Sequence, residues 1–247
     1  MRVDVAFTPE GLRPAEVHGR TVFVVDILRA TTAMCAAMCH GAKAMIPVDS
    51  TEEALRLAQT IGRSGVLLAG EKNCLRIPGF HLGNSPLEMT ESAVRGKTII
   101  VTTSNGTRAL LACQGADSVY PAAAANLSLA AERAREAVDS GSRVLIVCAG
   151  RGGEFAIEDA YCAGRLVAAT LSDRRPRPGL GDAAIASLDL VKRYGDGWQR
   201  PLARSRAGRE LIRLGFRSDV DDAARVDAYP VLPQFHERRL TLMPVHA

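Results

Sequence analysis

The sequence has few aromatic residues and no long hydrophobic run. Phe, Trp and Tyr make up 4% of the 247 residues, so Ala, Val, Leu and Ile must form most of the core. No apolar run reaches the roughly 18 residues that a membrane helix needs. The N-terminal MRVDVAFTPEG also lacks the basic-then-apolar pattern of a secretion signal. We therefore expect a cytoplasmic protein that does not bind membranes.

An excess of charge of one sign is missing too. The 31 basic and 27 acidic side chains leave a scattered net charge of +4, so no nucleic-acid partner is predicted. The six cysteines form neither a CxxC pair nor a zinc-ligand spacing, and this predicts free, mostly buried thiols. An apolar fraction of 47% excludes long disordered segments. The length fits one α/β unit over residues 1–247, or two lobes with the active site in the cleft between them.

Short apolar runs rich in Val and Ile alternate with helical patterns along the chain. Strands that are covered on both faces have this composition. We predict strands over residues 21–26, 44–48, 65–70, 97–103, 118–122, 142–150 and, near the end, 239–245. We predict helices over residues 31–42, 50–62, 126–141, 157–171, 183–194 and 201–214. Repeated β-then-α units indicate an α/β fold, with a mainly parallel or mixed sheet flanked by helices in αβα layers.

The sequence also predicts the ends of one helix and the positions of two loops. Ser50 and Glu53 form a capping-box pattern at the start of one helix, and Gly62 ends it. The basic, Pro- and Gly-rich segment 172–182 is expected to be an exposed loop. Residues 71–96 show no clean strand pattern, and loops of this length in a compact domain are usually functional.

Charged and polar residues follow several of the predicted strands. In a parallel sheet, ligands bind at the carboxyl ends of the strands. Carboxylates occur there at Asp26, Glu71, Glu158 and Asp159. Groups suited to anions occur at Arg29, Lys72, Arg108, Arg151 and the turn over residues 103–107. Anion-binding groups beside several carboxylates indicate a divalent metal ion, such as Mg²⁺, shared with a phosphorylated substrate. The chemistry would be phosphoryl transfer, most simply to water.

Two common nucleotide-binding motifs are absent. The turn over residues 103–107 lacks the GxxxxGK[ST] spacing of a P-loop. The glycines at 150, 152 and 153 are not a dinucleotide fingerprint, because Phe155 stands where GxGxxG needs a third glycine. An NAD-binding protein is therefore not expected.

The same strand-end segments resemble the Mg²⁺-dependent 2-phosphosulfolactate phosphatases of the ComB type. The matching segments are VVDILRATT (24–32), GE (70–71), GFHLGNSP (79–86), TTSNGTRAL (102–110), AGRGGEFAIEDAYCAG (149–164) and, more weakly, GFRSDVDDAARVD (215–227). The resemblance implies an α/β fold and Mg²⁺ as cofactor. It also implies hydrolysis of (R)-2-phospho-3-sulfolactate to 3-sulfolactate and phosphate, a reaction of coenzyme M biosynthesis. One departure is His81, because the family commonly has Asp in this segment.

The strand-end pattern and the resemblance together give a set of expected site residues. We expect catalytic roles for Asp26, Arg29, Glu71 and Asp159, and metal ligands among Asp26, Glu71, Glu158 and Asp159. The substrate would contact Thr31, Asn84, Ser85, Thr103, Asn105, Gly106, Thr107 and Arg151. Arg29 and the 105–107 turn would hold the phosphate, and Arg108, Arg151 or Lys72 the second anion of the substrate.

Several alternatives stay open from the sequence. The attacking group is either water activated by the metal ion or Asp26 as a covalent nucleophile. The substrate is phosphosulfolactate or another 2-phosphorylated carboxylic acid. A third hypothesis is that the chain binds phosphate esters without hydrolysing them. A homo-oligomer is also considered, because many cytosolic enzymes form one.

Overall fold

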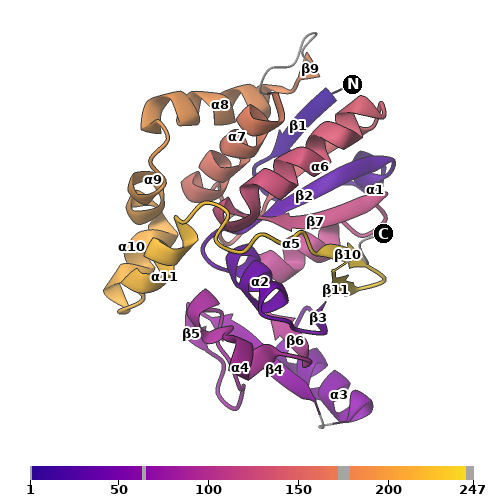
Figure 1. Ribbon diagram of the computed structural model, residues 1–247, viewed down its shortest axis with the longest axis vertical. Helices are drawn as coiled ribbons and strands as arrows, with labels where there is room; N and C mark the ends of the chain where they lie inside the picture. The colour runs from indigo at the N-terminus through magenta and orange to yellow at the C-terminus, as the bar shows by residue number, and fades with distance from the viewer. Residues whose placement is uncertain (1, 63–64, 172–178, 243–247) are drawn as a thin grey trace.

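The computed structural model describes residues 2–62, 65–171 and 179–242 (Figure 1). Its strands are β1 (Arg2–Ala6), β2 (Arg20–Val25), β3 (Ala44–Pro47), β4 (Val66–Lys72), β5 (Leu75–Arg76), β6 (Thr98–Thr102), β7 (Ser118–Ala122), β8 (Arg143–Cys148), β9 (Gly179–Leu180), β10 (Gln234–His236) and β11 (Arg239–Thr241). Its helices are α1 (Pro14–Val17), α2 (Ala30–Cys39), α3 (Thr51–Ile61), α4 (Glu91–Val94), α5 (Gly106–Ala112), α6 (Leu127–Asp139), α7 (Ile157–Leu171), α8 (Asp182–Tyr194), α9 (Gln199–Arg204), α10 (Arg206–Arg213) and α11 (Arg217–Ala223), with 3₁₀ turns at Pro86–Glu88 and Ala124–Asn126.

The eleven strands form one mixed sheet, in the order β5-β4-β6-β3-β11-β10-β7-β2-β8-β1-β9. Two blocks within it are parallel: β4, β6 and β3 form one, and β7, β2, β8, β1 and β9 form the other. The antiparallel hairpin β10–β11 lies between them and pairs with β7 on one side and β3 on the other.

The two parallel blocks run in opposite directions. Between the two blocks, β3 pairs with β11, β11 with β10, and β10 with β7, and all three pairings are antiparallel. An odd number of antiparallel pairings makes β3 and β7 run in opposite directions. Figure 1 shows that the carboxyl ends of β2 and β4 are both directed toward the region between the two blocks. Polar residues that follow β2, β4, β6 and β8 are together there, because residues from all four segments line one pocket.

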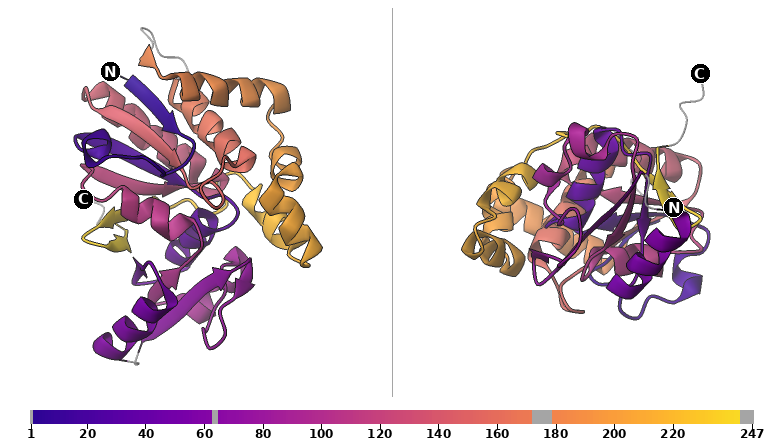
Figure 2. Two further views of the ribbon diagram at one scale, coloured as in Figure 1. Left: turned by 180° about the vertical axis from the view of Figure 1, so that it is seen from behind. Right: turned by 90° about the horizontal axis from the view of Figure 1, so that it is seen from below.

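Helices cover both faces of the sheet. In Figure 1, α2 and α6 lie in front of the strands, whereas α5 is in front in the reverse view of Figure 2. The helix α2 follows β2 into the interior, and its residues from Ala30 to Met38 are all buried. Small side chains such as Ala33 and Ala36 let this helix pack closely against its neighbours. It therefore fixes the loop that precedes it, residues 26–29.

The C-terminal third adds a helical layer beside the larger block. Helices α9, α10 and α11 stack along one side of the molecule, shown in orange and yellow in Figure 1. Trp198, which is 4% exposed, anchors α9 by packing edge-to-face on Tyr161 of α7 at 5.1 Å between ring centroids. This layer brings α10 and α11 to the ends of β2 and β8.

The predicted α/β class with a mainly parallel, mixed sheet is confirmed. The six strands predicted before residue 150 correspond to β2, β3, β4, β6, β7 and β8, with ends that differ by at most two residues. Ser50 caps α3 by accepting a hydrogen bond from the Glu53 N–H, as expected. Four of the cysteines are buried and all six are free. None of the described helices is long and apolar enough to cross a membrane.

Other local predictions were wrong. The first strand, β1, was missed, and the long segment after residue 71 contains the short strand β5. The single helix expected over 201–214 is two helices, because Ser205 ends α9 and its hydroxyl caps α10 by accepting the Gly208 N–H. In the loop expected at 172–182, residues 172–178 lie outside the described residues, and the remainder contributes β9 and the start of α8. The last predicted strand corresponds to β11, and its residues 243–245 also lie outside the described residues.

Candidate active site

A pocket of about 500 Å³ lies where the carboxyl ends of the two parallel blocks meet. The β2–α2 loop contributes Asp26, Leu28 and Arg29, and the β8–α7 loop contributes Gly150, Arg151, Gly152 and Glu154. The end of β4 and the turn after it contribute Glu71, Asn73 and Cys74, and the turn after β6 and the start of α5 contribute Ser104, Asn105 and Arg108. The remaining lining residues are Glu158 and Asp159 of α7, Arg206 and Ala207 of α10, and Asn84. Both blocks and the helical layer therefore contribute to one site.

Strand register explains why these residues meet. Val25, directly before Asp26, pairs with Cys148 at the end of β8. Gly70, directly before Glu71, pairs with Thr102 at the end of β6. Residues that follow paired strand ends leave the sheet side by side, so each block presents two adjacent loops.

Asp26 is at the base of the pocket and is 7% exposed. Its Oδ1 accepts a hydrogen bond from the Ala30 N–H at 3.3 Å. The pKa of Asp26 is raised to about 7, mainly by burial and also by the nearby charges of Glu71 and Glu158, against the opposing effects of that hydrogen bond and of the Arg29 charge. This carboxyl group therefore changes its protonation state near neutral pH.

Gly106, the first residue of α5, makes room for this carboxylate. A Cβ atom at Gly106 would lie 2.4 Å from the Cβ of Ala30 and 2.7 Å from Oδ2 of Asp26. Both distances are well below van der Waals contact. The glycine therefore allows α5 to approach α2 and the Asp26 side chain.

Two other carboxylates hold loops in place. Asp159 accepts the N–H of Ile27 at 3.0 Å and the N–H of Gly150 at 3.1 Å, joining the loops after β2 and β8. Glu71 accepts the N–H of Cys74 and the N–H of Ser104, each at 2.8 Å, joining the loops after β4 and β6. Each block thus has one carboxylate that ties its two loops together.

Glu158 is a buried carboxylate in the first turn of α7 and is 4% exposed. Burial raises its pKa, while a hydrogen bond from its own backbone N–H, the Ser205 hydroxyl and the charges of Arg151 and Arg209 act in the opposite direction. Burial also raises the pKa of Asp159, and the charges of Asp26 and Glu158 add to this effect. Three carboxyl groups thus lie together in the pocket, and burial favours the protonated form of each while no cation is bound.

Arg29 is held by a buried network. Its Nη1 donates to Oδ2 of Asp219 at 2.6 Å, its Nη2 donates to the carbonyl of Cys74 at 2.6 Å, and its guanidinium lies 4.7 Å from the Phe216 ring centroid. Asp219, 2% exposed, also accepts the Ser85 hydroxyl through Oδ1 at 2.7 Å. A guanidinium has five N–H donors, so these two bonds leave three for a ligand in the pocket.

The charges of the lining residues do not balance. Five carboxylates, at Asp26, Glu71, Glu154, Glu158 and Asp159, face four arginines, at Arg29, Arg108, Arg151 and Arg206. Among the described residues, no three His, Cys, Asp or Glu side chains are grouped closely enough to form a preassembled metal centre. A phosphate bound in this pocket would therefore need a further positive charge, and Mg²⁺ commonly uses only one or two carboxylates together with phosphate oxygens and waters.

Comparison with known proteins identifies the family. The family model described as 2-phosphosulpholactate phosphatase matches residues 6–238. The chain belongs to the 2-phosphosulfolactate phosphatase family. Relatives named probable 2-phosphosulfolactate phosphatase include one from Symbiobacterium thermophilum, 39% identical over 92% of this chain and 96% of its own length. Those from Thermotoga maritima and Clostridium acetobutylicum are 36% and 32% identical, over 94% and 95% of this chain and 94% and 97% of their own lengths.

Eight of the site residues expected from the sequence line the pocket of this 2-phosphosulfolactate phosphatase family member: Asp26, Arg29, Glu71, Asn84, Asn105, Arg151, Glu158 and Asp159. Arg108, a candidate for a second anion, lines it too, whereas Lys72 does not. Five others are not among the lining residues: Thr31, Ser85, Thr103, Gly106 and Thr107. These five are buried behind the pocket wall.

The residues behind the wall support the loops. Thr31 accepts the Asp26 N–H at 3.1 Å through its hydroxyl, and Thr107 accepts the Thr103 N–H at 3.2 Å. The Asn105 side chain accepts the Gly152 N–H at 2.9 Å, which connects the smaller block to the larger one. These bonds fix the pocket walls.

His81, the departure within the GFHLGNSP segment, is remote from the pocket. Its Nδ1 accepts the Leu68 N–H at 3.0 Å, and it lines a separate hollow next to α3. An aspartate could accept the same N–H. The substitution therefore affects the edge of β4 rather than the pocket.

Sequence reasoning missed four residues at or next to the site: Cys74, Glu154, Arg206 and Asp219. Cys74 follows the expected Glu71 but has no motif of its own. Asp219 lies in the weakly matching segment 215–227, which was its only signal. Arg206 and Glu154 form an exposed ion pair at 2.9 Å that links α10 to the β8–α7 loop.

Proposed function

We propose that this chain is a Mg²⁺-dependent phosphatase that hydrolyses (R)-2-phospho-3-sulfolactate to 3-sulfolactate and phosphate. The observation that carries the proposal is the charge of the main pocket, where five carboxylates face four arginines at the carboxyl ends of four strands. Such a site holds a phosphate dianion only with an added cation. The names of the related proteins supply the substrate in this proposal.

Asp26 and Glu158 are the residues that fit a role as Mg²⁺ ligands best. Both are buried and line the pocket, and burial raises the pKa of both. Perturbed carboxyl groups of this kind in a pocket are candidates for a functional role. Glu71 and Asp159 use their carboxylates on backbone N–H groups, so we assign them first to the shape of the loops. When bound, Mg²⁺ would supply neutralisation of the charge on the transferring phosphoryl group.

The chain's own groups would bind and orient the phosphate. Arg29 lines the pocket with its guanidinium fixed by Asp219, Cys74 and Phe216, so little side-chain freedom is lost when a phosphate binds its remaining donors. The turn at residues 105–107 begins α5 beside Asp26 and is the second group assigned to the phosphate, through Asn105, the one residue of this turn that lines the pocket. Water and Asp26 remain the two candidate nucleophiles.

The test is phosphate release from a panel of 2-phosphorylated carboxylic acids, including phosphosulfolactate, 2-phospholactate and phosphoglycolate, with Mg²⁺ and then with excess chelator. We expect chelator-sensitive release, fastest from phosphosulfolactate. Faster release from another acid would assign the chain a different substrate in the same reaction class. No release from any ester by the folded protein would indicate a binding module.

Cytoplasmic location and a place in coenzyme M biosynthesis are part of the same proposal.

A further inference from the structure

A smaller pocket of about 240 Å³ opens beside the main one. It lies between the β8–α7 loop and the segment from the end of α9 into α10, and we call it the side pocket. Arg151, Glu154, Glu158 and Arg206 line both pockets, so the two are continuous. A ligand in the main pocket can therefore extend into the side pocket.

The side pocket has the opposite charge balance to the main pocket. Four arginines, at Arg151, Arg204, Arg206 and Arg209, face two glutamates, at Glu154 and Glu158. Within the part of the chain that the structure describes, no carboxylate lies within ion-pair distance of Arg151, Arg204 or Arg209. Glu158 does feel the charges of Arg151 and Arg209, but two glutamates do not balance four guanidinium groups, and an anionic ligand between these groups would offset the excess positive charge.

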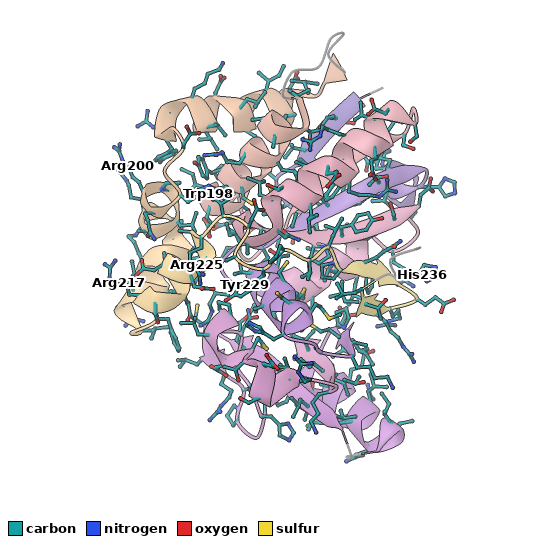
Figure 3. The ribbon with its side chains drawn as sticks, viewed as in Figure 1. Trp198, Arg200, Arg217, Arg225, Tyr229 and His236 are labelled. Carbon is teal, nitrogen blue, oxygen red and sulfur yellow. The ribbon has the colours of Figure 1, made fainter. Side chains whose placement is uncertain are left out.

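Arg206 does have an acidic partner, Glu154, but this ion pair is weak. The side chains of Arg206 and Glu154 are 70% and 72% exposed, and ion pairs this exposed contribute little to stability. A ligand anion can therefore replace Glu154 at low cost. Arg200 and Arg217, by contrast, project outward from α9 and α11 in Figure 3 and line neither pocket.

One wall of the side pocket is apolar. Phe155 is 51% exposed and packs edge-to-face on Phe7 at 5.1 Å between ring centroids. A wall of this kind suits a methylene group that carries an anion. A sulfonate is fully ionised at all physiological pH values and has three oxygens for guanidinium donors.

We infer that the side pocket binds the sulfonate tail of the substrate, and that Arg206 and Arg209 of α10 determine specificity for it. This inference rests on the proposed function. The phosphate would occupy the main pocket, whereas the CH₂–SO₃⁻ group would lie along Phe155 toward the two arginines.

The test compares two esters that differ only in this tail. 2-Phospholactate has a methyl group where 2-phosphosulfolactate has the CH₂–SO₃⁻ group. The measured quantity is the ratio of kcat/KM for phosphosulfolactate to kcat/KM for phospholactate. We expect Arg209→Gln, and separately Arg206→Gln, to lower this ratio about 10- to 100-fold, the usual effect of losing a hydrogen bond to a charged group.

Arg213→Gln is the matched control. Arg213 lies on the same helix, is exposed, pairs with Glu210 and lines neither pocket, so the ratio should be unchanged. Free ethanesulfonate provides a second readout. It should inhibit competitively, and its inhibition constant should rise in Arg209→Gln but not in Arg213→Gln.

The outcomes separate the inference from the proposed function. An unchanged ratio in folded Arg206→Gln and Arg209→Gln overturns the inference alone. Non-competitive inhibition by ethanesulfonate, with an unchanged ratio, also overturns it and identifies a separate anion site. If the folded wild-type protein hydrolyses neither ester, the proposed function fails and the inference fails with it.

Discussion

At the residue scale, Asp26 combines burial with closely placed negative charge. Its carboxyl group is 7% exposed and lies near Glu71 and Glu158. Such an arrangement destabilises the folded protein when the group is ionised and no cation is bound. The same arrangement would favour a divalent cation, so under the proposed function Asp26 trades stability of the metal-free protein for metal binding.

Replacing Asp26 with Asn should therefore abolish activity and stabilise the metal-free protein. Because burial raises the pKa of Asp26 from 3.8 to about 7, the folded state holds this proton more tightly than the unfolded chain does. The free energy of unfolding of the wild type should fall as the pH rises from about 4 to about 7, and this decrease should be smaller in Asp26→Asn. Turnover should fall by several powers of ten. Urea titrations with chelator at pH 5 and pH 8 measure the stability effect, and equal pH dependence in both proteins would contradict it.

Asp219 illustrates a residue that acts through another. It bonds Arg29 and Ser85 but is not among the residues that line the main pocket. Asp219→Asn would keep an oxygen that can accept from Arg29 but would remove the negative charge that pairs with its guanidinium, so the Arg29 side chain would be held less firmly. We expect kcat/KM to fall about 10- to 100-fold, the effect of losing a charge-assisted hydrogen bond.

A double-mutant cycle tests this positioning role. Arg29→Lys removes the planar fork that Asp219 orients, so the effects of Arg29→Lys and Asp219→Asn should not add. Asp221→Asn, at an exposed position on the same helix, is the control and should leave kcat/KM unchanged. Fully additive effects of the two buried variants would show that Asp219 does not act through Arg29.

Sequence reasoning found the carboxylates because each lies near the carboxyl end of a strand. Asp26 directly follows β2, Glu71 is near the end of β4, and Glu158 and Asp159 are in the first turn of the helix after β8; a rule of fold geometry applies to these positions. Asp219 and Arg206 could not be found in this way, because they lie on helices far along the chain. Only tertiary packing of α10 and α11 brings them to the pocket.

At the element scale, the contact between α2 and α5 controls the shape of the pocket. Gly106 starts α5 directly against Ala30 and Asp26. No larger residue fits unless the two helices separate. The walls of the pocket therefore depend on a helix–helix contact as well as on the loops.

Gly106→Ala should accordingly destabilise the protein by about 1–3 kcal/mol, the usual cost of overpacking. Thermal unfolding should shift down by several degrees, and activity should fall because the Asp26 side chain is displaced. Gly197→Ala serves as a control, because a Cβ atom there would have no neighbour within 4 Å. A melting temperature as high for Gly106→Ala as for Gly197→Ala would show that α5 adjusts freely.

The strand pattern predicted most elements but not their order in the sheet. β2, β4, β6 and β8 are continuous apolar runs, and such runs are recognisable without any partner. The hairpin β10–β11 is only three residues per strand, and its position between β3 and β7 depends on pairings across more than a hundred residues. Local patterns carry no information about such pairings.

At the scale of the whole molecule, binding at the pocket should stabilise both blocks together. The pocket is built from loops of both parallel blocks and from α10. A ligand that binds only this assembled state shifts the folding equilibrium by mass action.

We expect Mg²⁺ at about 100 times its dissociation constant to stabilise the protein by about 2.7 kcal/mol. For a chain of this length, the melting temperature should rise by about 5–10 °C. Ca²⁺ at the same concentration tests selectivity, and Asp26→Asn tests the site, since it should reduce the shift. An equal shift in Asp26→Asn would place the metal elsewhere.

The position of the β10–β11 hairpin has a consequence for biosynthesis. Among the described residues, only residues 234–241 join the two parallel blocks by strand pairing, and they are synthesised after every other described strand. A nascent chain that lacks them can form each block but cannot complete the sheet that aligns both sets of loops. We predict that ribosome-bound chains stalled before residue 230 are cleaved by protease between the blocks, whereas the released chain is resistant. A pocket that needs loops of both blocks would then form only after the hairpin has been synthesised, so the order of synthesis would limit when a ligand can first bind.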